Sequence, residues 1–303
     1  MPDKDPTSEY LAMRDAAAVV DPAWAAVAVR GADAVTFLQG LLSQDLRPGT
    51  CLRTFLLGPR GKLRAIAWAI TDDTSVILVT ESGRRQVLVD DLARYRIRVD
   101  AEITADDRPV RMVVGPASDD VLGVTVPPHG WVASGDALIG DITFAGRTRR
   151  VVVGEAPDLT GGVVAGSSAA TAVRIELGEP VMDVDVDEGT IPQETGLVPS
   201  AVAFDKGCYL GQELVARIDS RGRVNQRLVG LRVTTNVIPP PGAEVVVDDA
   251  VLGTITSVGE SLDLRAPVGL GVVRREAEDG RSVVLRWAGG EVPAIVMSLP
   301  MGG

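Results

Sequence analysis

The chain has 303 residues, of which 46% are hydrophobic and 23% charged, and its 41 acidic residues outnumber 30 basic ones to give a net charge of −11. The single histidine, His129, excludes metal sites that need two, and two cysteines cannot form a four-thiolate zinc or iron–sulfur site within one chain. We therefore expect no resident metal. The acidic balance also argues against direct DNA binding, which usually needs a basic face.

The first ten residues, MPDKDPTSEY, contain no basic segment followed by an apolar one, and charged residues interrupt every apolar run of the chain. We therefore expect neither a signal peptide nor a transmembrane helix, and no membrane partner. Two cysteines do not make a secreted disulfide framework, so free thiols in a reducing cytoplasm are expected.

The N-terminal part of the chain predicts a mixture of helices and strands after a frayed segment at residues 1–9. Asp33 is the candidate N-cap of the first strong helix, whose apolar residues share one face: Val35, Leu38, Leu41 and Leu42. Two strands are predicted on either side of a Gly-Pro-Arg-Gly turn at 58–61. The other elements expected in this part are strands at 74–80 and 110–115 and helices after Ser82, at 168–177 and at 211–218.

Three consecutive prolines in IPPPG at 238–242 interrupt any regular element and mark the clearest boundary in the sequence. Beyond them, short β-branched segments alternate with turn residues, a pattern typical of a small antiparallel barrel. We therefore predict an α+β protein. Its mixed body covers 1–237 and consists of two interleaved subdomains, and a β-barrel domain covers 238–303.

Several features invite a functional interpretation that their spacing does not support. GPRGK at 58–62 lacks the spacing of a phosphate loop, and GLG at 269–271 lacks the third glycine of a dinucleotide fingerprint. DVDVDE at 183–188 lacks the glycine and glutamate of a calcium loop, so a solvated strand or loop edge is the better interpretation. His129 is interpreted as a loop residue and Cys51 as part of an apolar core.

The most informative segment is FDKGCYLGQELVARIDSRGRVNQR, at 204–227. Cys208 lies two positions after Lys206 and close to the start of a predicted helix, and both an ammonium group and a helix N-terminus stabilise a thiolate. Glycines at 207 and 211 let the backbone approach a ligand closely. The alternative is that Cys208 is a small buried hydrophobic residue, as most free cysteines are.

The same segment carries a net positive charge, whereas the chain as a whole is negative. Residues 206–227 contain five basic side chains and two acidic ones, Glu213 and Asp219. Beside a candidate thiolate, this reversal favours an anion-binding mouth over a merely solvated face. Arg217 also stands four residues after Glu213, so part of the charge is explained by pairing within the helix.

The octapeptide KGCYLGQE at 206–213 resembles the signature of the YgfZ family, folate-binding proteins implicated in iron–sulfur cluster assembly or repair. Further blocks resemble the family in the same order, at 37–46, 92–99, 174–183, 191–195 and 253–259. The family shares its fold with the T-protein of the glycine cleavage system. The resemblance implies three subdomains around a central cavity for tetrahydrofolate or a folate derivative, the last subdomain being an antiparallel β-barrel.

The resemblance also suggests site residues. Glu176 lies where T-proteins use a glutamate to bind the pterin ring, and a carboxylate suits the two parallel N–H donors of that ring. Tyr209 and Gln212, within the cysteine motif, are further candidates for folate contacts. From their charge, Arg217 and Arg223 are candidates for the polyglutamate tail of a cellular folate.

Three functional hypotheses follow. The leading one is a folate-binding accessory protein that serves iron–sulfur client enzymes or assembly proteins, with Cys208 and Lys206 as its chemically active pair. The second is a folate-dependent one-carbon transferase acting on an amine or a modified tRNA, and the third is a folate-sensing scaffold with a packing cysteine. Aminomethyl transfer itself is not expected. T-proteins place an aspartate soon after the hairpin glycines, whereas this chain has Ala65 near that position and no acid between Gly61 and Ala69.

Overall fold

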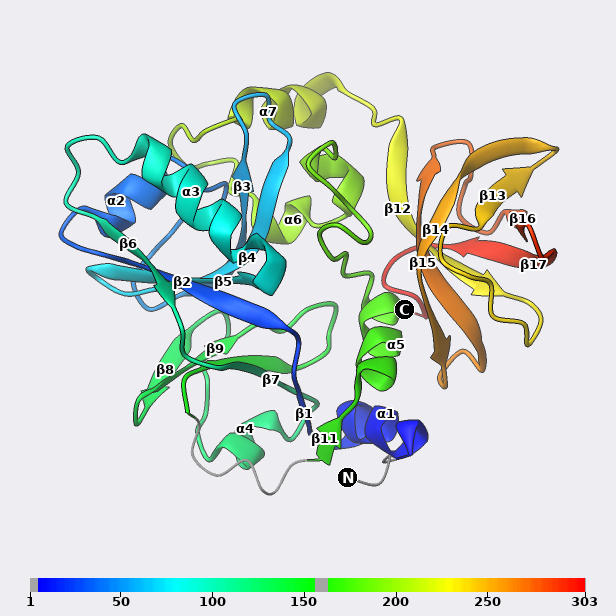
Figure 1. Cartoon of the computed structure of the whole chain (residues 1–303), viewed down its shortest axis with the longest axis horizontal. Coiled ribbons are helices and arrows are strands. Elements are labelled where there is room, and N and C mark those ends of the chain that lie inside the picture. The colour runs from blue at the N-terminus through cyan, green and yellow to red at the C-terminus, as the bar shows by residue number, and fades with distance from the viewer. Residues whose placement is uncertain (1–4, 156–162, 303) are drawn as a thin grey trace.

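The structure, a computed structural model, describes residues 5–155 and 163–302 of the chain. Two sheets stand against each other on the left of Figure 1, a barrel occupies the right, and a helix runs between them. None of the described helices has an apolar stretch long enough to span a bilayer.

The first sheet is antiparallel, with five strands among the described residues in the order β3-β4-β5-β2-β6. These strands are β2 (Trp24–Arg30), β3 (Cys51–Leu57), β4 (Leu63–Thr71), β5 (Ser75–Glu81) and β6 (Glu102–Asp106). Helices α2 (Ala34–Gln39) and α3 (Arg85–Tyr95) cover its outer face, and the short 3-10 helix η1 (Ser82–Arg84) precedes α3. The buried side chains of Leu38, Leu88 and Leu92 join these helices to the sheet.

The second sheet is mixed, and its described strands follow the order β11-β1-β7-β10-β9-β8. Its strands are β1 (Ala18–Val20), β7 (Val110–Val114), β8 (Trp131–Ser134), β9 (Ala137–Asp141), β10 (Arg149–Val153) and β11 (Val163–Ala165). Helix α4 (Ser118–Leu122) packs on one face, where Leu122 joins Val113 and Val152. The other face meets the first sheet. Cys51 is fully buried in this contact, as predicted.

The C-terminal part is a closed antiparallel barrel in the order β12-β15-β14-β13-β16-β17. Its strands are β12 (Gln226–Val233), β13 (Glu244–Val247), β14 (Ala250–Ser261), β15 (Ala266–Arg274), β16 (Ser282–Trp287) and β17 (Gly290–Met297). The barrel therefore begins N-terminal of the boundary expected at residue 238, because the prolines at 239–241 lie in the connection between β12 and β13. How the chain divides into independently folding units stays a prediction.

The remaining helices connect these parts: α1 (Pro6–Asp15), α5 (Ser167–Leu177), η3 (Pro192–Thr195), α6 (Val198–Ala201) and α7 (Gln212–Arg221). Helix α5 stands between the second sheet and the barrel (Figure 1). The expectation of fraying at 1–9 is wrong for its described part, since α1 begins at Pro6 and buries Tyr10 and Met13 against α5.

The first predicted helix is shorter than its apolar pattern indicates. Helix α2 ends at Gln39, and Leu41 and Leu42 continue the buried face from the turn that follows. The carboxylate of Asp33 does not cap the helix but accepts a hydrogen bond of 2.9 Å from the backbone N–H of Asp100. Tertiary contacts thus replace the local cap.

Candidate functional site

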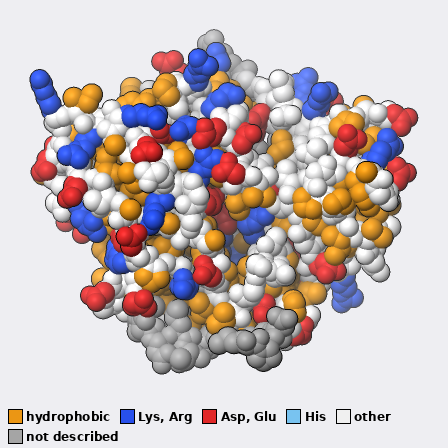
Figure 2. All heavy atoms as spheres, in the orientation of Figure 1, with side chains coloured by type: hydrophobic (Ala, Val, Ile, Leu, Met, Phe, Trp, Pro, Cys, Tyr) orange, Lys and Arg blue, Asp and Glu red, His pale blue; other side chains and the backbone are white. Residues whose placement is uncertain are grey.

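A cavity of about 510 Å³ lies where the two sheets, α5 and the barrel meet. The first sheet contributes Ile66, Trp68 and Glu81 to its wall, and the β1–β2 connection leads into Trp24. Figure 2 shows this face of the molecule hollowed near its centre, with acidic and basic side chains inside the hollow. The volume falls within the usual range for small-molecule sites, and the wall is mostly apolar with a few polar groups.

Two buried arginines share one carboxylate at the cavity wall. Arg53 of β3 is 1% exposed and pairs with Glu179, which also receives two hydrogen bonds from Arg149, at 2.5 and 3.0 Å. The Arg53 guanidinium stacks on the rings of Trp68 and Phe144, 4.5 and 4.1 Å from their centroids. Burial disfavours ionisation of Glu179, but the two arginines outweigh it and lower the pKa of that carboxyl to about 2.

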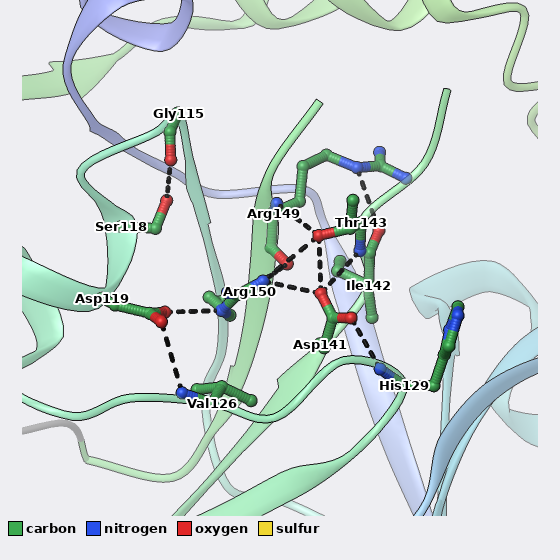
Figure 3. A network of polar contacts seen from close by, with 10 residues as sticks. All are labelled: Gly115, Ser118, Asp119, Val126, His129, Asp141, Ile142, Thr143, Arg149 and Arg150. Atoms are coloured by element: carbon green, nitrogen blue, oxygen red, sulfur yellow. Dashed lines mark hydrogen bonds and ion pairs between the residues drawn. The ribbon is translucent and has the colours of Figure 1, made fainter. Parts of the chain in front are cut away.

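A second polar network surrounds Arg150 and the strand ends next to Arg149 (Figure 3). The neighbouring Arg150 pairs with Asp119 at 2.7 Å and Asp141 at 2.6 Å. Asp141 also accepts the backbone N–H of His129, which is exposed in a loop with φ of 57°. His129 is therefore a loop residue, as predicted, and the network fixes the strand ends from which Arg149 extends.

The acidic run at 183–188 forms a loop edge that is mostly exposed, as predicted, with Asp185 as its buried acidic residue. Asp185 receives Arg174 of α5 at 2.7 Å and the hydroxyl of Ser257 at 2.6 Å, and so ties α5 to the barrel. Asp183 and Glu188 both pair with Arg84. Among the residues that the structure describes, no group of three or more potential ligands is arranged to hold a metal ion.

Lys206 is turned toward the segment that follows α2. Its ammonium group donates hydrogen bonds to the backbone oxygens of Leu42 and Gln44, at 2.8 and 2.7 Å, and to the side chain of Gln39 at 3.5 Å. Burial lowers the pKa of Lys206 to about 8, and the charge of Asp45 opposes this shift. The expected role of Lys206 as the partner of Cys208 is therefore not supported, because its three N–H donors are directed elsewhere.

The other motif side chains also pack against the body. Tyr209 lies in the apolar cluster beneath β3 and β4, and burial raises its pKa to about 12. Gln212 accepts the backbone N–H of Tyr209 at 3.2 Å. Gly211, with φ of 78°, lies so close to the β3–β4 hairpin that a Cβ atom would be 2.5 Å from the oxygen of Gly58. The folate contacts predicted for Tyr209 and Gln212 stay predictions, and neither residue lines the cavity.

Cys208 is exposed and makes no side-chain hydrogen bond to a described residue. Helix α7 begins at Gln212, four residues later, so the thiol lies outside its first turn, the range over which a helix N-terminus acts. Cys208 is also absent from the cavity wall. The motif therefore folds around the hairpin and leaves its cysteine on the surface, which is not the arrangement of a packing cysteine.

Glu176 does not line the cavity either. It is buried on the side of α5 that faces α1 and accepts the hydroxyl of Tyr10 at 2.6 Å. Burial raises the pKa of Glu176, and hydrogen bonds from Ser261 and Tyr10 counteract the shift. Its predicted contact with a pterin stays a prediction that this geometry does not support.

The predicted arginines are not gathered at the cavity. Arg217 and Arg223 are exposed on α7 and just after it, along the upper edge of Figure 1, and form no ion pair with a described residue. Arg227 pairs with Asp279 of the barrel at 2.7 Å. A contact between these residues and a folate tail therefore has no support from the geometry.

The residues that do line the cavity were missed from the sequence. Arg53 lies in the apolar strand CLRTFLL, and a charged residue inside a buried strand was an available signal. Glu81 and Trp24 stand at strand ends, where nothing in the local pattern indicates which side they face. Their convergence depends on how the two sheets meet.

The barrel matches the family described as Glycine cleavage T-protein C-terminal barrel domain, over residues 226–301. The crystal structure of the glycine cleavage system aminomethyltransferase T from Bartonella henselae superimposes with a TM-score of 0.86. It covers 97% of this chain and 89% of that one, at 21% sequence identity. The molecule therefore has the T-protein fold, and the predicted α+β class with a C-terminal antiparallel barrel is confirmed.

Relatives found by sequence comparison belong to the same group of proteins as this fold. The chain is 26% identical over 249 residues to the tRNA-modifying protein YgfZ of Klebsiella pneumoniae, with 73% of each chain covered. It is 24% identical over 300 residues to an aminomethyltransferase of Caldanaerobacter subterraneus, covering 88% of this chain and 79% of the relative. The resemblance to the YgfZ family, related in fold to aminomethyltransferases, is confirmed.

Proposed function

We propose that the protein binds tetrahydrofolate or a related folate derivative in the central cavity. The observation that carries the proposal is the 510 Å³ cavity, in which two tryptophans, Trp24 and Trp68, and a set of buried charged groups meet inside a T-protein fold. A flat bicyclic pterin fits aromatic walls by stacking, and the polar groups supply orientation. The relatives named as aminomethyltransferases and as tRNA-modifying YgfZ proteins support the same ligand class.

Titration of tetrahydrofolate against the purified protein, followed by calorimetry, tests this proposal. Replacing Trp24 with Leu is expected to weaken affinity about fivefold, because ring stacking contributes about 1 kcal/mol beyond buried area. Trp131→Phe is the matched control, because Trp131 donates its ring N–H to Thr71 and does not line the cavity. Absence of binding to the unaltered protein, or equal affinity of the Trp24→Leu variant, would contradict the proposal.

The protein's role is proposed to be that of an accessory factor in tRNA modification that supports iron–sulfur client enzymes, with Cys208 as the active thiol. Support comes from the motif, in which the side chains of Lys206, Tyr209 and Gln212 make internal contacts while the thiol of Cys208 is exposed. With Cys51 buried in the core, one chain offers a single accessible thiol. Any cluster handled here is therefore substrate, shared with a partner or a second chain.

Complementation of a strain that lacks the protein tests the thiol. Cys208→Ala is expected to abolish restoration of modified tRNA and of iron–sulfur enzyme activity while leaving tetrahydrofolate affinity unchanged, because the cysteine lies outside the cavity wall. Asp205→Asn, an exposed change three residues earlier, serves as the control. Full restoration by Cys208→Ala would remove the thiol from the proposal and leave folate binding standing.

Aminomethyl transfer is not part of the proposal. Strand β4 reads LRAIAWAIT and contains no acid, and Ala65 packs toward the outer helices instead of the cavity. The β4 residues that line the cavity are Ile66 and Trp68, neither of which can take a proton from a folate nitrogen.

A further inference from the structure

The connection between β1 and β2, residues 21–23, carries the chain from the second sheet to the first and leads into Trp24 (Figure 1). All three of its residues line the cavity together with Trp24, which packs against the apolar cluster that contains Trp68. The position of this aromatic wall therefore depends on the shape of a short connection that belongs to neither sheet. The proposed function assigns no residue to holding that shape.

The backbone of the connection is turned sharply at Ala23. The N–H of Ala23 donates to Oδ1 of Asp21 at 3.1 Å, and the ring of Pro22 restricts the backbone between them. Ala23 itself has a φ of 55°, in the left-handed region, where a residue with a Cβ atom is strained. Such a conformation persists only where other contacts hold it, so the turn needs support from outside the connection.

Ser82, the residue that follows β5, supplies this support. Its backbone N–H and its hydroxyl both donate to the carbonyl oxygen of Ala23, at 2.9 and 2.6 Å. One carbonyl oxygen can accept both bonds because it has two lone pairs. A serine at the start of a helix commonly caps it, but η1 has no side-chain cap, and the Ser82 hydroxyl is directed to Ala23 instead. Ser82 is exposed and is not among the described residues that line the cavity.

We propose that Ser82 is a positioning residue of the ligand site: by holding the carbonyl of Ala23, it keeps the left-handed turn in place and the Trp24 ring on the cavity wall. The inference rests on the proposed folate site and adds a residue that acts on the ligand only through Trp24. When the hydroxyl is removed, the connection gains conformations in which the ring leaves the wall. Binding must then restore the order of the ring, which lowers the affinity.

A double-mutant cycle of tetrahydrofolate affinity, measured by calorimetry, tests this inference. Ser82→Ala is expected to weaken affinity about threefold, in the range of one exposed hydrogen bond, whereas Ser82→Thr keeps the hydroxyl and is expected to bind as the unaltered protein does. In a protein that already carries Trp24→Leu, Ser82→Ala is expected to cause no further loss, because its effect passes through the missing ring. Equal losses in the two backgrounds overturn the inference.

Ser220→Ala is the matched control. It removes a hydroxyl that donates to the backbone oxygen of Arg217 at 3.3 Å on the exposed helix α7, and Ser220 is not among the described residues of the cavity wall. Its affinity for tetrahydrofolate is expected to equal that of the unaltered protein. A threefold loss in Ser220→Ala as well would assign the effect to a general loss of stability and would overturn the role of Ser82.

Fluorine NMR of the protein labelled with 5-fluorotryptophan supplies a readout that needs no ligand. The chain has four tryptophans, and the signal that is missing from Trp24→Leu belongs to Trp24. Ser82→Ala is expected to shift or broaden that signal and to leave the signal of Trp287, in the barrel, unchanged. An unchanged Trp24 signal overturns the inference whether or not folate binds. If the Trp24 signal changes but the unaltered protein does not bind tetrahydrofolate, the proposed function fails, while the anchoring of Trp24 by Ser82 stands.

Discussion

At the scale of single residues, the cavity wall is organised by Glu179. Its carboxylate neutralises one of the two buried guanidinium groups, of Arg53 and Arg149, and bonds to both. Burial lowers the pKa of Arg53 to about 10 in spite of the opposing charge of Glu179. Buried charges of this kind are costly when one partner is missing, since the remaining charge has neither water nor a counter-ion.

Replacing Glu179 with Gln is therefore expected to lower the free energy of unfolding by about 3–5 kcal/mol, the usual effect of removing one partner of a buried pair. Urea unfolding followed by circular dichroism measures the change. Glu213→Gln, an exposed change on α7, is the control and is expected to stay within about 0.5 kcal/mol. A loss below about 1 kcal/mol for Glu179→Gln would show that water or rearrangement compensates the arginines.

The same residue predicts an acid dependence. Because the folded state holds the pKa of Glu179 at about 2, below its ordinary value of 4.5, folding favours the ionised form. Its contribution is fully present above that ordinary value and is lost as pH falls through it toward about 2. Unfolding free energies measured across this acid range are expected to fall less steeply in Glu179→Gln than in the unaltered protein. Parallel curves would mean that other groups carry the acid dependence.

At the scale of elements, the segment that contains the cysteine motif packs against the β3–β4 hairpin. The two touch through glycines, since a Cβ atom at Gly61 would lie 2.6 Å from that of Leu214, and one at Gly211 would meet the oxygen of Gly58. On the other side, Lys206 binds the backbone that follows α2. The surface position of Cys208 thus depends on contacts made by its neighbours.

Gly211→Ala is expected to destabilise the protein by about 2 kcal/mol or more, because it adds a backbone clash to the strain of a positive φ. Gly207→Ala is the matched control within the same motif. No described atom beyond the chain neighbours lies within 4 Å of a Cβ built there, so its effect should be small. Thermal unfolding of both variants measures the difference. Equal losses of stability in the two variants would show that the hairpin moves to make room for the added methyl group at residue 211.

The sequence predicts elements well where local patterns decide them. The hairpin at 58–61, the helix at 168–177 and the burial of Cys51 follow from turn residues, periodicity and an apolar context. The cavity could not be predicted from such local patterns, because its wall combines β3, β5, α5 and β14, which meet only in the tertiary fold. The direction of the Lys206 side chain could not be predicted from the sequence either. Two positions that are close in sequence need not place an ammonium group next to a thiol, and Lys206 binds the backbone oxygen of Gln44 instead.

At the scale of the whole molecule, the barrel is closed by its first strand. Strand β12 pairs with β15 on one side and with β17 on the other, and its residues Val229, Leu231 and Val233 point into the barrel core. The prolines that dominate the sequence pattern lie inside this unit, so a division at residue 238 removes one of the strands that closes the barrel.

A fragment beginning at residue 226 is therefore expected to fold, whereas one beginning at residue 238 is expected to remain unfolded or to aggregate through the exposed edges of β15 and β17. Dispersion of amide signals in NMR spectra distinguishes the two. The longer fragment also exposes the face around Met301 and Leu270 that α5 covers in the whole chain. Failure of both fragments would show that this cover is needed for the barrel to fold.

The cavity has walls on both sheets, on α5 and on the barrel strand β14. A small molecule bound there contacts several of these parts at once, so its binding favours the folded arrangement in which they are held together. The ties that hold the parts together, such as Asp185 between Arg174 and Ser257, favour the same arrangement. Arg174 and Ser257 are themselves wall residues, so a change that loosens this tie is expected to alter both the stability of the fold and the fit of the ligand.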